Sequence, residues 1–196
     1  MAVYMWEIPE SYPHKLIGEY DREHSPDRFL FLYGKPLARS EVSTTPIIKF
    51  EVSKNKLTPY DCLPTNTSSP IVNNRLAALL LEHAENDIQL FDVKIECTDG
   101  ELEGYKLVNI THMMKGMDYE QSIYKTIDLP DDESMIALIS KLVLRPDCMG
   151  TYQLMREEES ENLLVSQRLY DVFKREKVTG VWLATPDEFY DLVHGK

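Results

Sequence analysis

The sequence predicts an α+β domain in which a few short helices cover a mixed or antiparallel sheet. Two observations lead to this prediction. Short runs of β-branched and aromatic residues, bounded by Pro, Gly, Asn and Asp, recur along the chain and are typical of strands. Helical periodicity is confined to a few short segments, and two of these lie between strand-like runs, which favours helices packed on a sheet.

The first 70 residues are predicted to be strands joined by long irregular segments. Val3–Ile8 is rich in β-branched and aromatic residues, and it is expected to form the first strand. Residues 9–28 contain three prolines and many charged side chains, so we expect a loop there. Phe29–Tyr33 and Ile47–Val52 are the next predicted strands. Residues 53–70, rich in Asn, Thr, Ser and Pro, are expected to form a connection.

The first helix is predicted to begin at Asn73 or Asn74. An Asn side chain at this point can accept a hydrogen bond from the free amides of the first helical turn. The helix is expected to end near Glu85, and the alternating segment Ile88–Cys97 then forms a strand. Tyr105–Met114 is predicted as the next strand. The face shared at helical spacing consists of Leu76, Leu79, Leu80 and His83.

A polar turn between two strands is predicted in the segment Leu107–Ile127. The segment begins as a strand, breaks at Gly116 and becomes strand-like again at Ile123. After it, the acidic residues of Pro130–Glu133 favour the start of a helix, because acids stabilise the positive end of a helix dipole. The buried face of that helix would comprise Met135, Ile136, Ile139 and Leu142. The C-terminal half of this segment fits a strand equally well.

The C-terminal part is predicted to be a strand, a helix and a further strand. After a strand at Thr151–Met155, Leu163–Ser166 forms a second strand, and its last residue is placed to cap a helix over Gln167–Glu176. Val181–Leu183 is the following strand. A last helical turn is expected within residues 187–194.

Two segments of the chain resemble each other internally. Ile71–Leu76 and Leu164–Leu169 match position by position in character, 93 residues apart, and each is followed by a helix and a strand. The match is short, so it favours a shared β–α–β topology more strongly than a duplication. Two copies are too few for a solenoid.

The length and charge of the chain limit its organisation and its partners. We expect one domain over residues 1–196, with an N-terminal strand and loop at 1–28, a core at 29–183 and a tail at 184–196. The formal net charge is −12, and most of it lies in the C-terminal half. Such a surface repels nucleic acid and anionic membranes, whereas it attracts a basic protein. The charge could equally serve only to keep the protein dissolved.

The composition also limits the chemistry that the protein can perform. Three widely spaced cysteines form no CxxC pair, so reduced thiols in a cytoplasmic protein are expected. The sequence shows no Sec-type signal and no apolar run long enough for a transmembrane helix. It contains no nucleotide-binding or metalloprotease motif, and its histidines do not pair at metal-ligand spacing. No cofactor or metal is therefore predicted.

The polar turn offers three interpretations. His112, Asp118 and Ser122 can be arranged as base, orienting acid and nucleophile of a small hydrolase, but such triples arise by chance in any chain of this length. The structural interpretation is favoured: Asp118 accepts hydrogen bonds from the amides that follow it and closes the turn. A contact with a protein partner through Asp118 and Glu120 is the next alternative.

A second acidic segment follows the strand at Thr151–Met155. Glu157, Glu158 and Glu159 are consecutive, and such a run is commonly a solvated hairpin tip. In a protein that binds a basic partner, it is also the first place to expect a contact. The predicted partner-binding residues are accordingly Asp118, Glu120, Glu157, Glu158 and Glu159.

Several short motifs follow one another along the chain: Gly34-Lys35-Pro36-Leu37, Pro70 to Leu76, Leu107-Val108-Asn109 leading to Asp118-x-x-x-Ser122, Leu164-Val165-Ser166 with Arg168-Leu169, and Thr179-Gly180-Val181. Taken in order, these motifs resemble an immunity-protein family of bacterial polymorphic-toxin systems that was long known only as a domain of unknown function. The likeness extends from Phe29 to Leu183 and is strongest after Leu107. Asn73 stands where a capping Ser is expected, and Trp182 replaces the more usual Arg or Lys.

The resemblance implies a non-catalytic protein that binds a cognate toxin domain and blocks its active site or the path of its substrate. The toxin would be basic if it attacks nucleic acid, which agrees with the acidic balance of this chain. An enzyme using the three residues of the polar turn, and a structural protein of unknown partner, are the alternatives.

Overall fold

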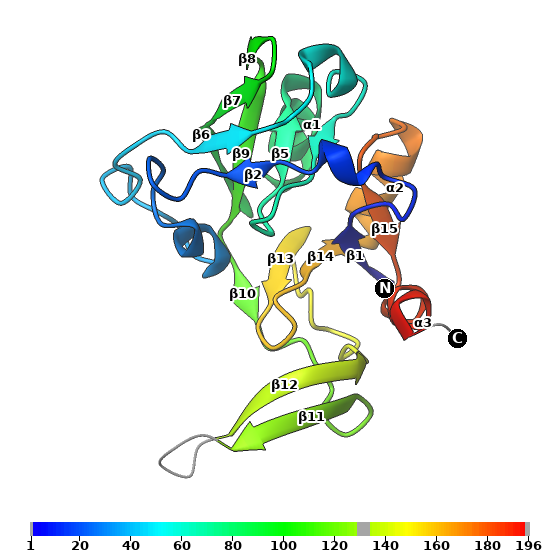
Figure 1. Ribbon diagram of the computed structural model, residues 1–196. Coiled ribbons are helices and arrows are strands. Elements are labelled where there is room, and N and C mark those ends of the chain that lie inside the picture. Colours follow the sequence, from blue (N-terminus) through cyan, green and yellow to red (C-terminus); the bar gives the residue numbers. More distant parts are fainter. Residues whose placement is uncertain (1, 129–133, 195–196) are drawn as a thin grey trace.

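The strands of the protein form three mixed or antiparallel sheets and one separate hairpin (Figure 1). The computed structural model describes residues 2–128 and 134–194. It has three α-helices in the described part of the chain: α1 (Asn74–Ala84), α2 (Gln167–Arg175) and α3 (Pro186–His194). The predicted α+β class is therefore confirmed.

Two of the sheets have the same arrangement around a helix. The first unit contains β4 (Cys62–Leu63), β5 (Ile71–Asn73), α1, β6 (Ile88–Asp92) and β9 (Tyr105–Ile110), in the sheet order β4–β5–β9–β6. The second unit contains β13 (Leu154–Glu157), β14 (Leu163–Ser166), α2, β15 (Trp182–Ala184) and β1 (Val3–Glu7), in the order β13–β14–β1–β15. In each unit two strands that are joined by a helix flank a central antiparallel strand. The central strand follows the helix in the first unit, whereas the N-terminus of the chain supplies it in the second.

The helices of the two units begin in the same way. The Asn73 side chain accepts a hydrogen bond from the Leu76 amide at 2.9 Å, and the Ser166 hydroxyl accepts one from the Leu169 amide at 3.2 Å. Each capping residue is also held by the residue before the first strand of its unit. Asn73 Nδ2 donates to Asp61 Oδ1 at 2.9 Å, and Ser166 Oγ donates to Gln153 Oε1 at 2.7 Å. The internal resemblance in the sequence thus corresponds to a shared topology.

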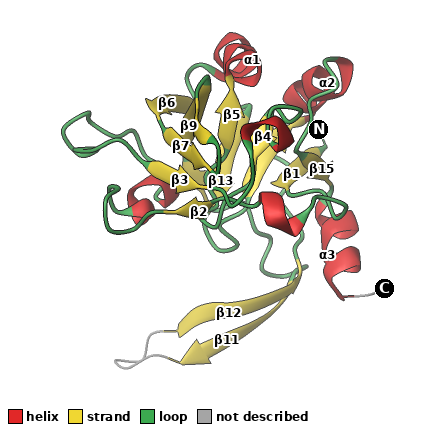
Figure 2. Ribbon diagram, turned by 45° about the horizontal axis from the view of Figure 1, so that its top comes forward, coloured by secondary structure: helices red, strands yellow, loops and turns green. Residues whose placement is uncertain are grey.

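A single core joins the two units. Leu76 and Leu80 from α1 pack in one cluster with Leu169 and Phe173 from α2, and both helices lie on the same side of the molecule (Figure 2). Trp6 of β1 contacts Phe173 edge to face, with ring centroids 5.2 Å apart. Burying large apolar side chains between the units stabilises the arrangement by about 1.5–3 kcal/mol for each side chain.

A third sheet and a second core lie beside the first unit. The sheet contains β2 (Glu19–Tyr20), β3 (Ile47–Lys49), β7 (Lys94–Cys97) and β8 (Gly100–Leu102), in that order. Its core includes Tyr20, Ile48 and Ile95, and β9 contributes Leu107 from the neighbouring sheet. Three short 3-10 helices lie next to these strands in the chain: His14–Leu16 before β2, Arg28–Leu32 between β2 and β3, and Lys54–Lys56 after β3.

A β-hairpin projects from this body (Figures 1 and 2). It consists of β11 (Ile123–Asp128) and β12 (Ser134–Lys141), and β10 (Met113–Met114), which pairs with β13, leads into it. A third core beneath the hairpin contains Met117 and Leu142, together with Tyr190 of α3. None of the helices in the described ranges is long and apolar enough to cross a membrane.

The secondary-structure type of two predicted elements was wrong. Phe29–Tyr33 is not a strand, because Asp27 accepts a hydrogen bond from the Phe29 amide at 3.0 Å and caps the 3-10 helix at Arg28–Leu32. The helix predicted over Met135–Leu142 is the strand β12, and Pro130–Glu133 lies outside the described residues.

The spacing that favoured a helix in β12 has a structural cause. Residues 136 and 139, and likewise 135 and 138, are three apart, as on one face of a helix. In β12 the register to β11 shifts twice, at Ala137 and at Ser140. Each β-bulge inserts one extra residue, so side chains three apart return to the same face of the strand.

Candidate partner-binding surface

The outer side of the hairpin carries apolar side chains that the protein leaves in solvent. Ile123 and Ile127 of β11 are 58% and 49% exposed, and Met135 and Leu138 of β12 are 49% and 46% exposed. The strand register places Ile127 opposite Met135 and Leu138 opposite Lys125, so these side chains share one face. We call the four apolar residues the hairpin face.

The opposite side of the hairpin explains why its position is fixed. Tyr124 pairs with Ile139 and Thr126 with Ile136 on this inner side. Tyr124, Ile136 and Ile139 pack against the third core.

An exposed cluster of large apolar residues is unusual in a monomeric protein and typically marks a site for a partner. The hairpin face is therefore a candidate docking surface.

At the base of the hairpin, Asp118 closes the turn that the sequence predicts. Its carboxylate accepts hydrogen bonds from the amides of Glu120 and Gln121 at 3.0 and 3.1 Å. The Gln121 side-chain amide donates to the same carboxylate at 2.7 Å. The Ser122 hydroxyl accepts a hydrogen bond from the Val143 amide at 2.9 Å and so ties the turn to the end of β12. Asp118 and Ser122 both shape the turn.

Glu157 organises the second acidic segment from within. It is fully buried, and its Oε1 accepts hydrogen bonds from the amides of Gly116 and Met117 at 3.0 and 3.1 Å. Its Oε2 accepts from the amides of Glu159 and Ser160 and from the Ser160 hydroxyl, at 2.7 to 2.9 Å. A carboxylate with these partners is not available to another protein, so Glu157 holds the surface together from beneath.

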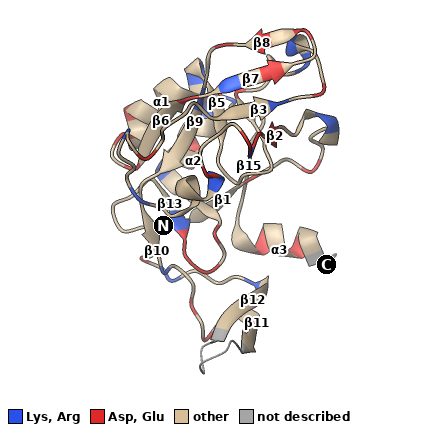
Figure 3. Cartoon of the chain, turned by 60° about the vertical axis from the view of Figure 1, so that its left-hand side comes forward, with Lys and Arg blue, Asp and Glu red and all other residues tan. Residues whose placement is uncertain are grey.

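The two predicted acidic segments come together in the structure. The Tyr119 hydroxyl donates to Glu159 Oε1 at 2.5 Å, and this hydrogen bond raises the pKa of Tyr119 to about 12. Lys115 approaches Glu158 at 3.7 Å. Figure 3 shows acidic positions on the chain between β10 and the hairpin and on the loop after β13. We call the resulting patch the acidic turn surface; it consists of Asp118, Glu120, Glu158 and Glu159.

The three residues of the hypothetical catalytic triad do not act together. The His112 ring stacks on Tyr152, and its Nε2 lies 3.0 Å from the Asn86 carbonyl oxygen. The side chains of Asp118 and Ser122 are engaged in the turn, and no side-chain hydrogen bond joins any two of the three residues in the described chain. The hydrolase interpretation therefore has no assembled site to support it.

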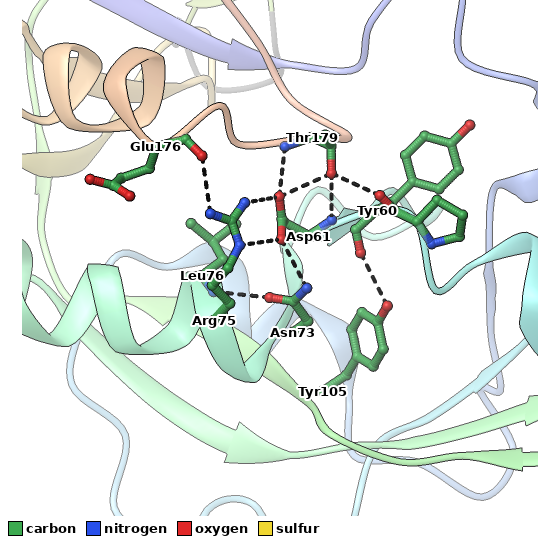
Figure 4. Close-up of polar contacts among 9 residues, drawn as sticks. Tyr60, Asp61, Asn73, Arg75, Leu76, Tyr105, Glu176 and Thr179 are labelled. Atoms are coloured by element: carbon green, nitrogen blue, oxygen red, sulfur yellow. Dashed lines mark hydrogen bonds and ion pairs between the residues drawn. The ribbon is translucent and has the colours of Figure 1, made fainter.

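A second polar cluster, around Asp61, lies where the two units meet (Figure 4). The Asp61 carboxylate accepts hydrogen bonds from Arg75 Nε and Nη2 at 3.0 and 2.5 Å and from Asn73 Nδ2. From the second unit, the Thr179 amide and hydroxyl donate to it at 2.8 and 2.9 Å. Arg75 Nη1 also donates to the Glu176 carbonyl at 3.0 Å. These bonds join residues of both units, so the cluster forms a joint between them.

The environment of Asp61 determines its charge. Burial by itself raises the pKa of this carboxyl, but the hydrogen bonds from Arg75, Thr179 and Asn73 outweigh it and hold the pKa below its ordinary value. Asp61 is therefore ionised at neutral pH. Within the described residues, no group of three or more His, Cys, Asp and Glu side chains is placed to hold a metal ion.

The sequence interpretation did not single out Asp61 or the buried residue Arg156. Their partners come from distant parts of the chain: Thr179 lies 118 residues from Asp61, and Ser68 lies 88 residues from Arg156. The sequence around Asp61 contains no local motif that predicts such contacts. The capping Asn73 and the neighbouring Arg75 were the closest available signals.

Comparison with known proteins bears on the role of this surface. Among curated proteins, none matches the chain. The model of the immunity protein family Imm11 matches residues 4–186, which include both units, the hairpin and the acidic turn surface. Over this extent, the chain belongs to the Imm11 immunity protein family.

Proposed function

We propose that the protein neutralises a cognate toxin domain by binding it through the hairpin face and the acidic turn surface, and that it thereby covers the active site of the toxin or the path of its substrate. Membership of an immunity family implies a toxin partner in general. The observation that carries the proposal is the projecting hairpin with four large apolar side chains in solvent.

The composition of the two surfaces suits a protein interface. Interfaces typically have an apolar centre and a polar rim, and their centres are poor in charged residues. The hairpin face supplies the apolar part, and Asp118, Glu120, Glu158 and Glu159 supply charge at its base. The hairpin also presents open edges, since neither β11 nor β12 pairs with another strand in the described chain. Open edges permit backbone hydrogen bonds with a partner strand.

The charge of the acidic turn surface supports a basic partner. Acidic groups at the rim of an interface mainly accelerate encounter with a positively charged protein, and they are screened by salt over about 8–10 Å at physiological ionic strength. We expect the net charge of −12 to add a weaker, long-range attraction. The partner that this surface favours is therefore a basic toxin domain.

Association kinetics test the charge component of the proposal. The candidate partner is the C-terminal toxin domain encoded by the reading frame next to this gene. The rate at which it associates with the protein is measured by stopped flow at increasing salt concentration. Glu120→Gln with Glu158→Gln should slow association by about tenfold at low salt and flatten its salt dependence, as expected for rim charges.

A matched pair of substitutions serves as the control. Glu51→Gln with Glu103→Gln removes the same charge from exposed positions that follow β3 and β8. This pair should change association much less. Salt-insensitive association of the unmodified protein, or equal slowing by both pairs, would contradict electrostatic steering through the acidic turn surface.

A further inference from the structure

A pocket of about 390 Å³ lies between the two units. The end of β1, the segment after β4 and the loop between β13 and β14 all contribute to its wall. None of its lining residues belongs to the hairpin face or the acidic turn surface. Its volume falls in the range of about 300–1,000 Å³ that is usual for small-ligand sites. The residues that the argument uses are Glu7, Ser68, Ser69, Arg156 and Glu161.

Arg156 brings a buried positive charge to this pocket. The residue is 1% exposed, and two of its nitrogens are engaged: Nη1 donates to the Glu161 carbonyl at 2.5 Å and Nη2 to the Ser68 carbonyl at 3.2 Å. Its Nε has no hydrogen-bond partner, and Arg156 forms no ion pair in the described chain. Burial lowers the pKa of Arg156 to about 10, so the guanidinium still carries its charge at neutral pH.

Such an arrangement is costly for the folded protein. Buried charges in proteins are normally paired or fully hydrogen-bonded, because transferring an unpaired ion out of water is strongly unfavourable. Arg156 offers five N–H groups, of which the two carbonyl contacts use two. Nε–H and one N–H on each Nη are not used by these contacts, and arginine binds a carboxylate through two such parallel N–H groups. A partner that matches this arrangement has the chemistry of an anion with two oxygens.

The backbone around Arg156 is strained at the two points that it contacts. Ser68 and Glu161, whose carbonyls accept its hydrogen bonds, have φ angles of +48° and +57°. In the described chain only Lys177 shares this conformation among residues other than glycine. Strain of this kind concentrates at binding sites. The carbonyl oxygens of these two strained residues hold the guanidinium in the wall of the pocket.

Two further groups add to the site. The Ser69 hydroxyl is buried and has no partner, although it lines the pocket and can donate one hydrogen bond. Burial raises the pKa of the Glu7 carboxyl to about 7, so at neutral pH a large fraction of Glu7 is uncharged and does not cancel the charge of Arg156. An incoming anion would thus meet the Arg156 cation, the Ser69 hydroxyl and a partly uncharged Glu7, together with one acidic side chain, Glu161, whose charge acts on Arg156.

We propose that this pocket binds a carboxylate, which the Nε–Nη edge of Arg156 and the Ser69 hydroxyl hold by hydrogen bonds. The carboxylate can belong to a small free acid or to the C-terminus of a polypeptide. Both sources present the same planar pair of oxygens. Binding measurements with acids of both kinds distinguish them. The site is independent of the surface proposed for the toxin.

Calorimetric titration of the full chain tests the proposal with three probes. N-acetylglycine represents a small free acid, acetyl-tetra-alanine represents a polypeptide C-terminus, and acetyl-tetra-alanine amide lacks the carboxylate. Saturable binding of either acid, with at least tenfold weaker binding of the amide, is the expected result. Equal affinity of the two acids indicates a small-molecule site, whereas preference for the peptide acid indicates a chain terminus.

Three substitutions make the assignment specific. Arg156→Lys keeps the charge but removes the planar guanidinium with its parallel N–H groups. It should therefore weaken binding of the acid by at least tenfold. Ser69→Ala removes a hydroxyl without a partner, so it should leave the fold intact and still weaken binding severalfold. Arg168→Lys, at an exposed position on α2, is the matched control and should change nothing. Absence of saturable binding by both acids, or binding unaffected by Ser69→Ala and Arg156→Lys, would overturn the proposal.

Discussion

Replacing Asp61 by alanine is expected to lower the free energy of unfolding by about 1–3 kcal/mol, the usual cost of leaving a buried hydrogen-bond donor without its acceptor. The ion-pair partner Arg75 is 47% exposed, so the pairing of charges itself adds little. Asp61 is 5% exposed and accepts hydrogen bonds from both units. Without it, the Thr179 amide and the Arg75 guanidinium lose their acceptor at the joint. Chemical denaturation followed by tryptophan fluorescence measures the loss, since Trp6 lies in the core that the units share.

An exposed ion pair supplies the matched control. Asp92 pairs with Lys106, but its side chain is 82% exposed, so Asp92→Ala should cost about 0–1 kcal/mol. Asp61→Asn keeps the size and part of the hydrogen bonding and should fall between the two. If Asp61→Ala were no more destabilising than Asp92→Ala, the joint between the units would not depend on this carboxylate.

The lowered pKa of Asp61 makes the stability of the protein depend on pH, and the direction of this dependence can be stated. Its hydrogen bonds depress the pKa in the folded protein below the ordinary value of 3.8, which the unfolded chain retains. The associated stability is therefore fully present above the ordinary value and is lost as the pH falls through the folded pKa. The unmodified protein should lose stability more steeply below pH 4 than the Asp61→Asn variant.

Replacing two residues of the hairpin face is expected to weaken toxin binding by about 100-fold. Fully burying an Ile or Leu side chain contributes about 1.5–3 kcal/mol, so a side chain that is already half-buried gains roughly 1.4 kcal/mol, or tenfold in Kd. Ile127→Ser should therefore cost about tenfold, and Ile127→Ser with Leu138→Ser about 100-fold. Calorimetry with the candidate toxin domain measures both values.

The control for this prediction lies on another element. Leu81 on α1 is 48% exposed, close to the values for Ile127 and Leu138, and α1 lies at the opposite end of the molecule from the hairpin (Figure 1). Leu81→Ser should leave Kd unchanged. All three variants replace half-exposed side chains, so their thermal unfolding should remain close to that of the unmodified protein. A Kd that Leu81→Ser raises as much as Ile127→Ser does would contradict a docking role for the hairpin.

Much of the fold could be predicted because its signals are local. The caps at Asn73 and Ser166 act within one helical turn, and so does the turn closed by Asp118. These side chains satisfy amides two or three residues away, which a linear pattern can indicate. The β–α–β topology followed from the same short segments.

Other features could not be predicted because they depend on contacts between distant residues. The alternation of Ile88–Cys97 is continuous, yet β6 pairs with β9 whereas β7 joins a different sheet. The bulges of β12 gave a strand the three-residue spacing of a helix. Glu157 was predicted to contact a partner together with its acidic neighbours. Its carboxylate is instead buried and accepts hydrogen bonds from five donors, two of which lie about 40 residues away in the chain.

The candidate surface was predictable in part. The sequence indicated the acidic segments at 118–120 and 157–159, and the structure places them together through Tyr119 and Glu159. It did not indicate the hairpin face: Met135 was assigned to the buried side of a helix, and Leu138 was assigned to no surface. An apolar pattern shows that residues share a face, and only the tertiary structure shows whether that face is covered.

Hydrogen exchange in the complex tests the central claim most directly, because it maps the contact without any substitution. Amides of the full chain are followed by mass spectrometry, alone and with a saturating amount of the candidate toxin domain. The proposal predicts that slowed exchange concentrates in residues 117–128, 134–143 and 157–160, with little change in α1 and β8. Slowed exchange confined to α1 or to the β2–β3–β7–β8 sheet, with the hairpin unchanged, would show that the toxin binds elsewhere.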